Sequence, residues 1–78
     1  MPHDFIAHSE RIEECLKLAG FAAVAECFED ARLGGSTSGE ILMGLRHQSL
    51  AAQSNKSLPA DVRADMAFLV REIDATGI

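Results

Sequence analysis

The chain has 78 residues, 47% of them hydrophobic, and a formal net charge of −5. A domain of this size buries only about 60 to 65% of the surface of its unfolded chain and leaves no room for a second core. All of the net charge lies in residues 1–40, which hold eight acids and three bases, whereas residues 41–78 hold four of each. Such a protein is repelled by nucleic acid and by anionic membranes and is attracted to basic protein surfaces.

Composition and turn signals together predict a helical fold. Alanine is abundant among the apolar residues, and the only aromatic residues are four Phe, which favours close-packed helices over a sheet. Turn-forming residues at Gly20, at 34–39 and at 53–59 divide the chain into four segments. We therefore predict an all-α, compact single-domain bundle or array of about four short helices over residues 1–78. The expected helices are residues 3–19, 21–33, 38–53 and 59–75.

The first two predicted helices are amphipathic and acidic. The buried face of the first is expected to hold Phe5, His8, Ile12, Cys15, Leu16 and Ala19, with Glu10, Glu13, Glu14 and Lys17 opposite. The buried face of the second is expected to hold Phe21, Val24, Cys27, Phe28 and Ala31, with Glu26, Glu29 and Asp30 outside. Gly20 either ends the first helix or interrupts one long helix, and we interpret it as a break.

The third and fourth predicted helices have clear start signals. Thr37 followed three residues later by Glu40 fits a capping box, and Pro59 is expected in the first turn of the last helix. The main face of the third helix holds Ile41, Leu42, Leu45, Ser49 and Ala52. The buried stripe of the fourth holds Val62, Met66, Leu69, Val70 and Ile73.

An aromatic side chain ringed by carboxylates lies on the other face of the fourth helix. Steps of four, three and four residues place Asp61, Asp65, Phe68 and Glu72 on one side of it. An apolar anchor with a charged rim is the kind of surface that a basic partner recognises. The alternative is that Phe68 packs against a second neighbouring helix of the array.

Two further surfaces are candidate contacts. Glu26 and Asp30 are like charges four residues apart, an arrangement that costs a few tenths of a kcal/mol of helix stability and hints at use in binding; a plain acidic surface is the alternative. Met43 and Leu50 point away from the main face of the third helix, either side of Arg46 and His47. They are a homodimer contact or the second packed side of a central helix.

No motif indicates a catalytic, cofactor-binding or metal site. His3 and His8 are five residues apart, which does not place them on a shared helical face, and His47 lies in another helix. The two cysteines lie symmetrically about the turn at Gly20, so a disulfide is conceivable, but we expect two reduced core thiols. The glycine-rich residues 34–39 lack the Lys-Ser/Thr ending of a phosphate-binding loop, and we interpret them as a helix stop followed by a helix start.

The chain resembles small bacterial immunity proteins in overall plan. The segments Gly34–Arg46 and Leu58–Arg63 look like those of short uncharacterised bacterial proteins of similar length. An acidic four-helix chain of this size without a catalytic motif is similar to small helical immunity proteins that neutralise cognate toxins, including the MafI group. This resemblance implies that a preformed acidic surface docks on a basic toxin domain, often a nuclease, and blocks it.

We therefore expect a protein-binding module and not an enzyme. The most specific form of this expectation is an immunity or antitoxin protein of the bacterial cytoplasm that binds a basic protein. We expect it to bind no nucleic acid, membrane or cofactor. The residues expected to contact the partner are Asp61, Asp65, Phe68, Glu72, Glu26 and Asp30. The alternatives are a structural or regulatory homodimer joined through Met43 and Leu50, a small helical adaptor, a small metal-dependent enzyme, and a helix-turn-helix module.

Overall fold

Four helices account for most of residues 3–77, the part of the chain that the computed structural model describes. They are α1 (Phe5–Leu18), α2 (Ala22–Gly34), α3 (Ser38–Gln53) and α4 (Ala60–Asp74), and no strand occurs in the described range. The predicted all-α fold is therefore confirmed, and each predicted helix lies within two residues of an observed one at both ends.

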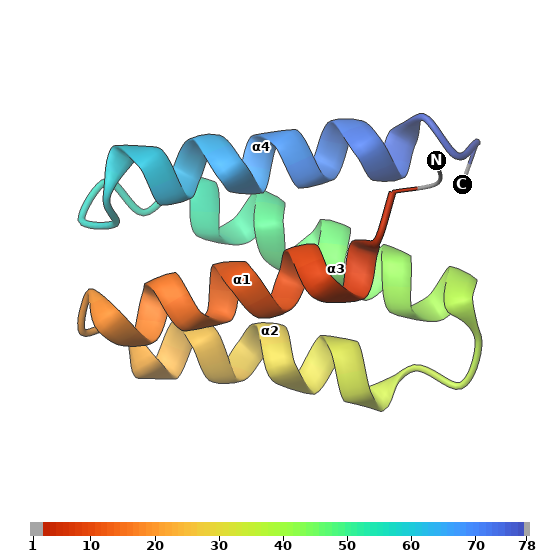
Figure 1. Ribbon diagram of the computed structural model, residues 1–78, viewed down its shortest axis with the longest axis horizontal. Helices are drawn as coiled ribbons and strands as arrows, with labels where there is room; N and C mark the ends of the chain where they lie inside the picture. The colour runs from red at the N-terminus through yellow and green to blue at the C-terminus, as the bar shows by residue number, and fades with distance from the viewer. Residues whose placement is uncertain (1–2, 78) are drawn as a thin grey trace.

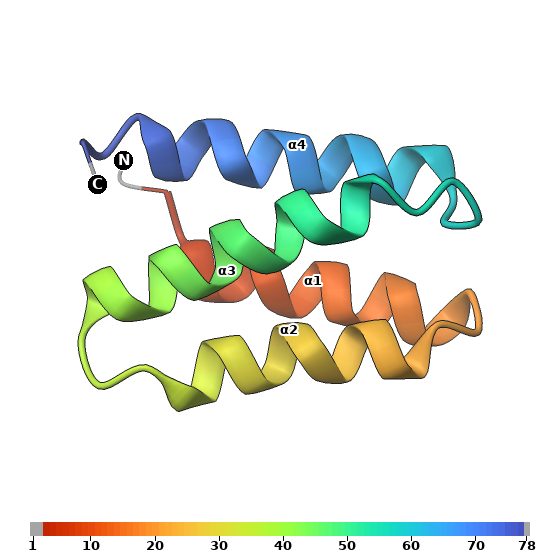
Figure 2. The same ribbon diagram turned by 180° about the vertical axis from the view of Figure 1, so that it is seen from behind.

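The helices form an up-down-up-down bundle. α1 packs against α2 and α4, and α3 packs against the same two helices from the other side. Figure 1 shows α1 in front with α3 behind it, and Figure 2 shows the reverse side with α3 in front. α1 begins and α4 ends at the same end of the bundle, as expected when short turns join antiparallel neighbours (Figure 1).

Local signals place the helix ends where the sequence indicates them. Gly20 has a φ of +89°, which only glycine adopts at little cost, and it ends the first helical unit as predicted. The backbone N–H of Glu40 donates to the Thr37 hydroxyl at 3.2 Å, and the Glu40 carboxylate accepts from the Ser36 N–H at 3.1 Å. Pro59 differs from the prediction, since it precedes α4 as an extended residue instead of lying in the first turn.

The core is one continuous apolar cluster in the middle of the four helices. The predicted buried stripes of α3 and α4 are confirmed, and Leu58 of the connecting loop adds to them. The fully or nearly buried apolar residues are Ile12, Leu16, Ala25, Phe28, Leu42, Leu45, Leu58, Val62, Met66, Leu69, Val70 and Ile73. Burying a Leu, Ile, Phe or Met side chain contributes roughly 1.5–3 kcal/mol, so this cluster holds the bundle together.

Two predictions about α1 and α2 are wrong. Cys15, Ala19 and Cys27 of the predicted buried faces are exposed, with both thiols free, whereas Ala25 of α2 is fully buried. Ser9 and Glu13 are buried, although Glu13 was expected on the outer face. The reason is that α1 lies between α2 and α4, so the part of its surface that is covered is wider than an apolar stripe.

A buried ion pair joins α1 to α2. The Arg32 Nε donates to Glu13 Oε2 at 3.0 Å, and a terminal guanidinium nitrogen of Arg32 donates to Glu13 Oε1 at 3.2 Å. The Glu13 side chain is 5% exposed and that of Arg32 is 17% exposed. The hydrogen bond to Glu13 raises the pKa of Arg32 above its ordinary value. The partner of Glu13 is therefore Arg32 of the next helix.

We expect Arg32→Ala to lower the free energy of unfolding by about 3 kcal/mol, because it leaves the Glu13 carboxylate buried without a counter-ion. Arg46→Ala is the matched control, since Arg46 pairs with Asp74 at 2.7 Å through side chains that are 34% and 47% exposed. An exposed pair of this kind contributes less than about 1 kcal/mol. Urea unfolding followed by circular dichroism measures both, and equal losses would contradict the assignment.

Within residues 3–77 no helix is long and apolar enough to cross a membrane.

Candidate functional site

An open groove of about 470 Å³ runs between α1 and α4. Its walls are Ile12, Cys15, Asp61, Val62, Ala64, Asp65, Phe68 and Arg71. A smaller hollow of about 320 Å³ continues it toward the α1–α2 turn and shares three of these residues, adding Leu18, Ala19 and Pro59. The two hollows form one channel along the seam between α1 and α4, the adjacent pair that packs least extensively. We call this channel the α1/α4 groove.

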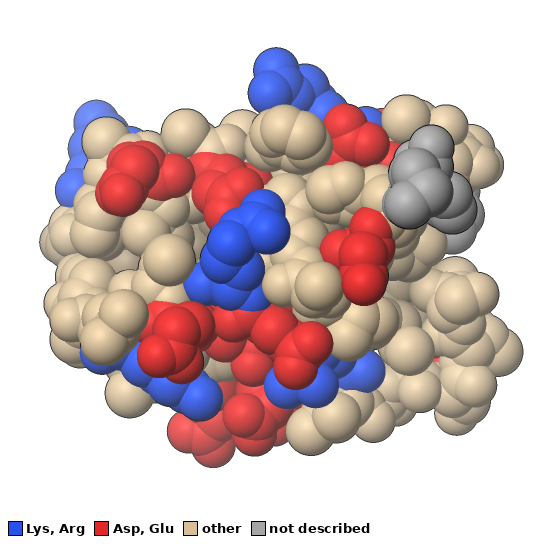
Figure 3. Space-filling view, viewed as in Figure 1, with Lys and Arg blue, Asp and Glu red and all other residues tan. Residues whose placement is uncertain are grey.

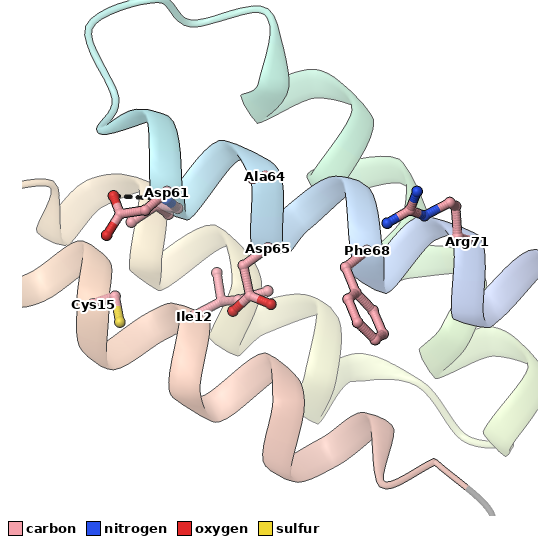
Figure 4. A pocket seen from close by; sticks show the side chains of 8 residues that line it. Ile12, Cys15, Asp61, Ala64, Asp65, Phe68 and Arg71 are labelled. Atoms are coloured by element: carbon pink, nitrogen blue, oxygen red, sulfur yellow. Dashed lines mark hydrogen bonds between the residues drawn. The ribbon is translucent and has the colours of Figure 1, made fainter.

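Three of the four residues predicted on α4 meet in this groove. Asp61, Asp65 and Phe68 all line it, whereas Glu72 is half-buried and lies outside its walls. Figure 4 shows Asp65 and Phe68 pointing from α4 toward α1. Phe68 is 42% exposed, so it is a surface residue and not part of the core.

Asp65 is bonded to α1 and is not a free carboxylate. His8, whose side chain is 1% exposed, places its Nε2 2.7 Å from Asp65 Oδ1. A terminal guanidinium nitrogen of Arg11 lies 3.7 Å from the same oxygen. This polar contact links α1 to α4 beside the groove, so Asp65 supports the site structurally, and the Arg11 guanidinium offsets part of its negative charge.

Two imidazole rings and one guanidinium group lie next to the Phe68 ring. The His3 ring stacks on it with centroids 5.9 Å apart, and the His8 ring meets it edge-on at 5.5 Å. The Arg71 guanidinium carbon lies 5.8 Å from the centre of the Phe68 ring, a cation–π distance. The predicted ring of carboxylates around Phe68 is therefore wrong in part, because cations and imidazoles occupy much of its surroundings.

Asp61 is the exposed carboxylate of the groove. Its Oδ1 accepts a hydrogen bond from the Val62 backbone N–H at 3.0 Å, near the positive end of the α4 dipole. It is solvent-exposed on the groove wall, where a cation of a partner has free access. Of the acids predicted on α4, Asp61 is thus the exposed one that lines the groove.

The exposed acids of α1 and α2 form a separate face. Glu26 and Asp30 are exposed on α2, outside the groove. Figure 3 shows acidic side chains gathered where α1 and α2 lie, below the groove in that view. Glu10, Glu13 and Glu29 all raise the pKa of Arg32, a sign of the negative potential at the α1/α2 seam. The structure thus separates an acidic face from an apolar groove with mixed charges.

Met43 and Leu50 project from α3 on the far side of the bundle. They are 47% and 45% exposed, so no second helix of the described chain covers them. Another hollow, between α2 and α3, is lined by Ala23, Val24, Cys27, Gln48, Ala51, Ala52 and Asn55. It has no formally charged side chain in its wall, which makes the α1/α4 groove the better candidate for a specific site.

Sequence reasoning missed the two histidines and the arginines of the site. His8 was expected on the buried face, and a buried imidazole needs a hydrogen-bond partner, which was the available signal for its pairing with an acid of another helix. No comparable signal pointed to His3 or Arg11, because their contacts depend on how α1 and α4 pack. Arg71 lies three residues after Phe68 on the same helix, a spacing that predicts their contact. Among the described residues, no three His, Cys, Asp or Glu side chains are arranged to hold a metal ion.

Comparison with known proteins adds no assignment, since no family model, no curated protein and no solved structure matches this chain.

Asp65→Ala is expected to lower the free energy of unfolding by roughly 1–3 kcal/mol, because it leaves the buried His8 ring without its partner. Asp61→Ala removes an equal charge one turn earlier on the same helix and is expected to cost about 0.5 kcal/mol through the helix dipole. Urea titrations of the two variants at neutral pH measure the difference. If Asp61→Ala is as destabilising as Asp65→Ala, the contact between His8 and Asp65 does not hold α1 on α4.

Proposed function

We propose that this domain is a protein-binding module, not an enzyme, and that it captures a partner with a basic surface in the α1/α4 groove. The observation that carries the proposal is the half-exposed Phe68 in an apolar channel between two helices, beside an acidic face. In its sharpest form the module is an immunity or antitoxin protein of the bacterial cytoplasm whose partner is a basic toxin domain.

The groove favours a partner that offers an amphipathic helix. It is a channel between two antiparallel helices, with Ile12, Val62 and Ala64 in its walls and Phe68 as an aromatic contact. Apolar side chains at helical spacing fit such a channel, as in other helix-in-groove complexes. A lysine or arginine on the rim of that helix has Asp61 as its counter-ion.

The acidic face has a different part in this proposal. Exposed charges such as Glu26 and Asp30 contribute little binding energy by themselves, because water and salt screen them. A net charge of −5 nevertheless raises the rate at which a basic partner arrives. Docking in the groove then covers the partner helix, and a toxin that needs this helix to bind substrate or assemble its active site is blocked.

Phe68→Ala is expected to weaken partner binding at least tenfold, since buried aromatic anchors carry much of the energy of an interface. The experiment immobilises the chain, captures partners from cells that carry its gene, and measures binding kinetics with the purified partner. Leu50→Ala is the matched control, because Leu50 has nearly the same exposed fraction on the opposite side of the bundle. It is expected to change affinity less than about threefold.

Charge variants separate steering from docking in the same kinetic experiment. Asp30→Lys on the acidic face is expected to slow association in low salt and to leave dissociation nearly unchanged. Asp61→Lys in the groove is expected to speed dissociation as well. If neither Phe68→Ala nor Asp61→Lys changes the affinity for the partner, the docking surface lies elsewhere and this proposal is wrong.

The homodimer is a second candidate, favoured by the exposure of Met43 and Leu50 on one face of α3. If α3 joins two copies of the chain, light scattering over a dilution series shows a mass that falls from dimer to monomer. Leu50→Lys is then expected to yield monomer at every concentration, because it places a charge in an apolar contact. A wild-type chain that is monomeric throughout the series excludes this candidate.

A further inference from the structure

A chain of polar contacts ties the residues before α1 to the groove. His3 Nε2 lies 2.7 Å from His8 Nδ1, and His8 Nε2 lies 2.7 Å from Asp65 Oδ1. The same His3 ring stacks on Phe68 and meets the Phe5 ring edge-on at 5.0 Å. His3 therefore covers part of the aromatic side chain that the proposed function assigns to partner docking.

Counting hydrogens shows how this contact depends on protonation. His8 Nε2 faces a carboxylate oxygen and donates its hydrogen there, so the short contact between the two rings has room for one hydrogen. With both rings neutral, His3 Nε2 donates to His8 Nδ1. One added proton is accommodated, either on His3 Nδ1 or by a charged His8 that donates to His3. A second added proton puts two N–H groups face to face and removes the bond.

Charged side chains of both signs lie near the two rings. On α4 the nearby charged groups are Asp65 and Arg71, and on α1 they are Arg11 and the capping residue Asp4. Arg71 lies over Phe68 and Arg11 beside Asp65, so the charged groups near the two rings are two cations, the bonded carboxylate of Asp65 and the capping carboxylate of Asp4. Two positive imidazoles whose nitrogens face each other at 2.7 Å also repel each other.

The other helices supply little to offset this repulsion. Arg32 of α2 is paired with Glu13, and Arg46 of α3 is paired with Asp74. Glu72, one turn beyond Phe68 on α4, makes no ion pair among the described residues. Among the described residues, Asp65 is the carboxylate that bonds to the pair of rings, through His8.

We propose that His3 is a proton-controlled latch over the Phe68 side chain of the α1/α4 groove, closed while His3 and His8 share one hydrogen bond and released when both rings are protonated. The proposal rests on the proposed function only in taking the uncovered groove as the docking surface. Asp4 stays in place when His3 is released, because the Asp4 side chain caps α1 through the Ala7 N–H at 2.9 Å and the Asp4 carbonyl accepts from the His8 N–H at 3.0 Å. The latch therefore opens without unfolding the helix.

Nuclear magnetic resonance of the labelled full chain tests the latch without any partner. At pH 7.5 the spectra should show a nuclear Overhauser contact between the His3 and Phe68 rings. On acidification through the range in which imidazoles take up protons, roughly pH 8 to 5, this contact should vanish once ring-nitrogen spectra show both His3 and His8 charged. A ring contact that persists with both imidazoles charged, or acid unfolding before both are charged, overturns the proposal.

Two variants test the covering of the groove at neutral pH. His3→Ala is expected to bind the apolar dye anilinonaphthalene sulfonate at least twofold more than wild type at pH 7.5, since it opens the groove without acid. His47→Ala, which removes an exposed histidine of α3, is the control and should match wild type. Equal dye binding by the two variants would show that His3 does not cover the groove.

These results and the capture experiment fail independently. If the ring contact is lost in acid as expected but Phe68→Ala binds the partner as well as wild type does, the docking surface is refuted and the latch stands. Loss of partner binding in Phe68→Ala, together with an unchanged ring contact in acid, refutes the latch alone.

Discussion

The structure depends on the need of buried polar side chains for partners, a constraint that acts most strongly on α1. This helix carries His8, Ser9 and Glu13 into its covered surface, where an unpaired polar group costs several kcal/mol. Ser9 satisfies itself by donating to the Ile6 carbonyl at 2.9 Å. Glu13 bonds to Arg32 of α2, and His8 bonds to Asp65 of α4. The two polar contacts attach α1 to its neighbours on both sides at defined registers.

The same constraint shapes the groove. α1 and α4 are joined by the hydrogen bond between His8 and Asp65 and not by a tightly packed apolar seam. Cys15 and Phe68 therefore remain exposed beside this contact. Polar bonds between helices are directional, whereas apolar packing tolerates sliding, so the seam holds its position while it stays open. A preformed hollow of this kind lowers the entropic cost of binding.

Charge is distributed so that attraction and contact involve different surfaces. The acids on α1 and α2 form the exposed face seen in Figure 3, and they act at a distance through the field of the whole protein. In the groove Asp65 is bonded to His8 and lies near Arg11, which leaves Asp61 as the exposed carboxylate of its wall. In the proposed function, the arrival of a basic partner and its docking therefore involve different surfaces, and the proposed His3 latch concerns docking alone.

Local sequence determined the helices, because their signals involve neighbours in the chain. Gly20 ends α1, Thr37 and Glu40 cap α3, and the apolar spacing of α4 identifies its buried stripe. The same spacing placed Asp61, Asp65 and Phe68 on one side of α4, and all three line the groove. Only the packing of the bundle decided which charges are free. Asp65 faces His8 from a helix 57 residues away in sequence, and no local pattern records a contact that depends on how two helices are brought together.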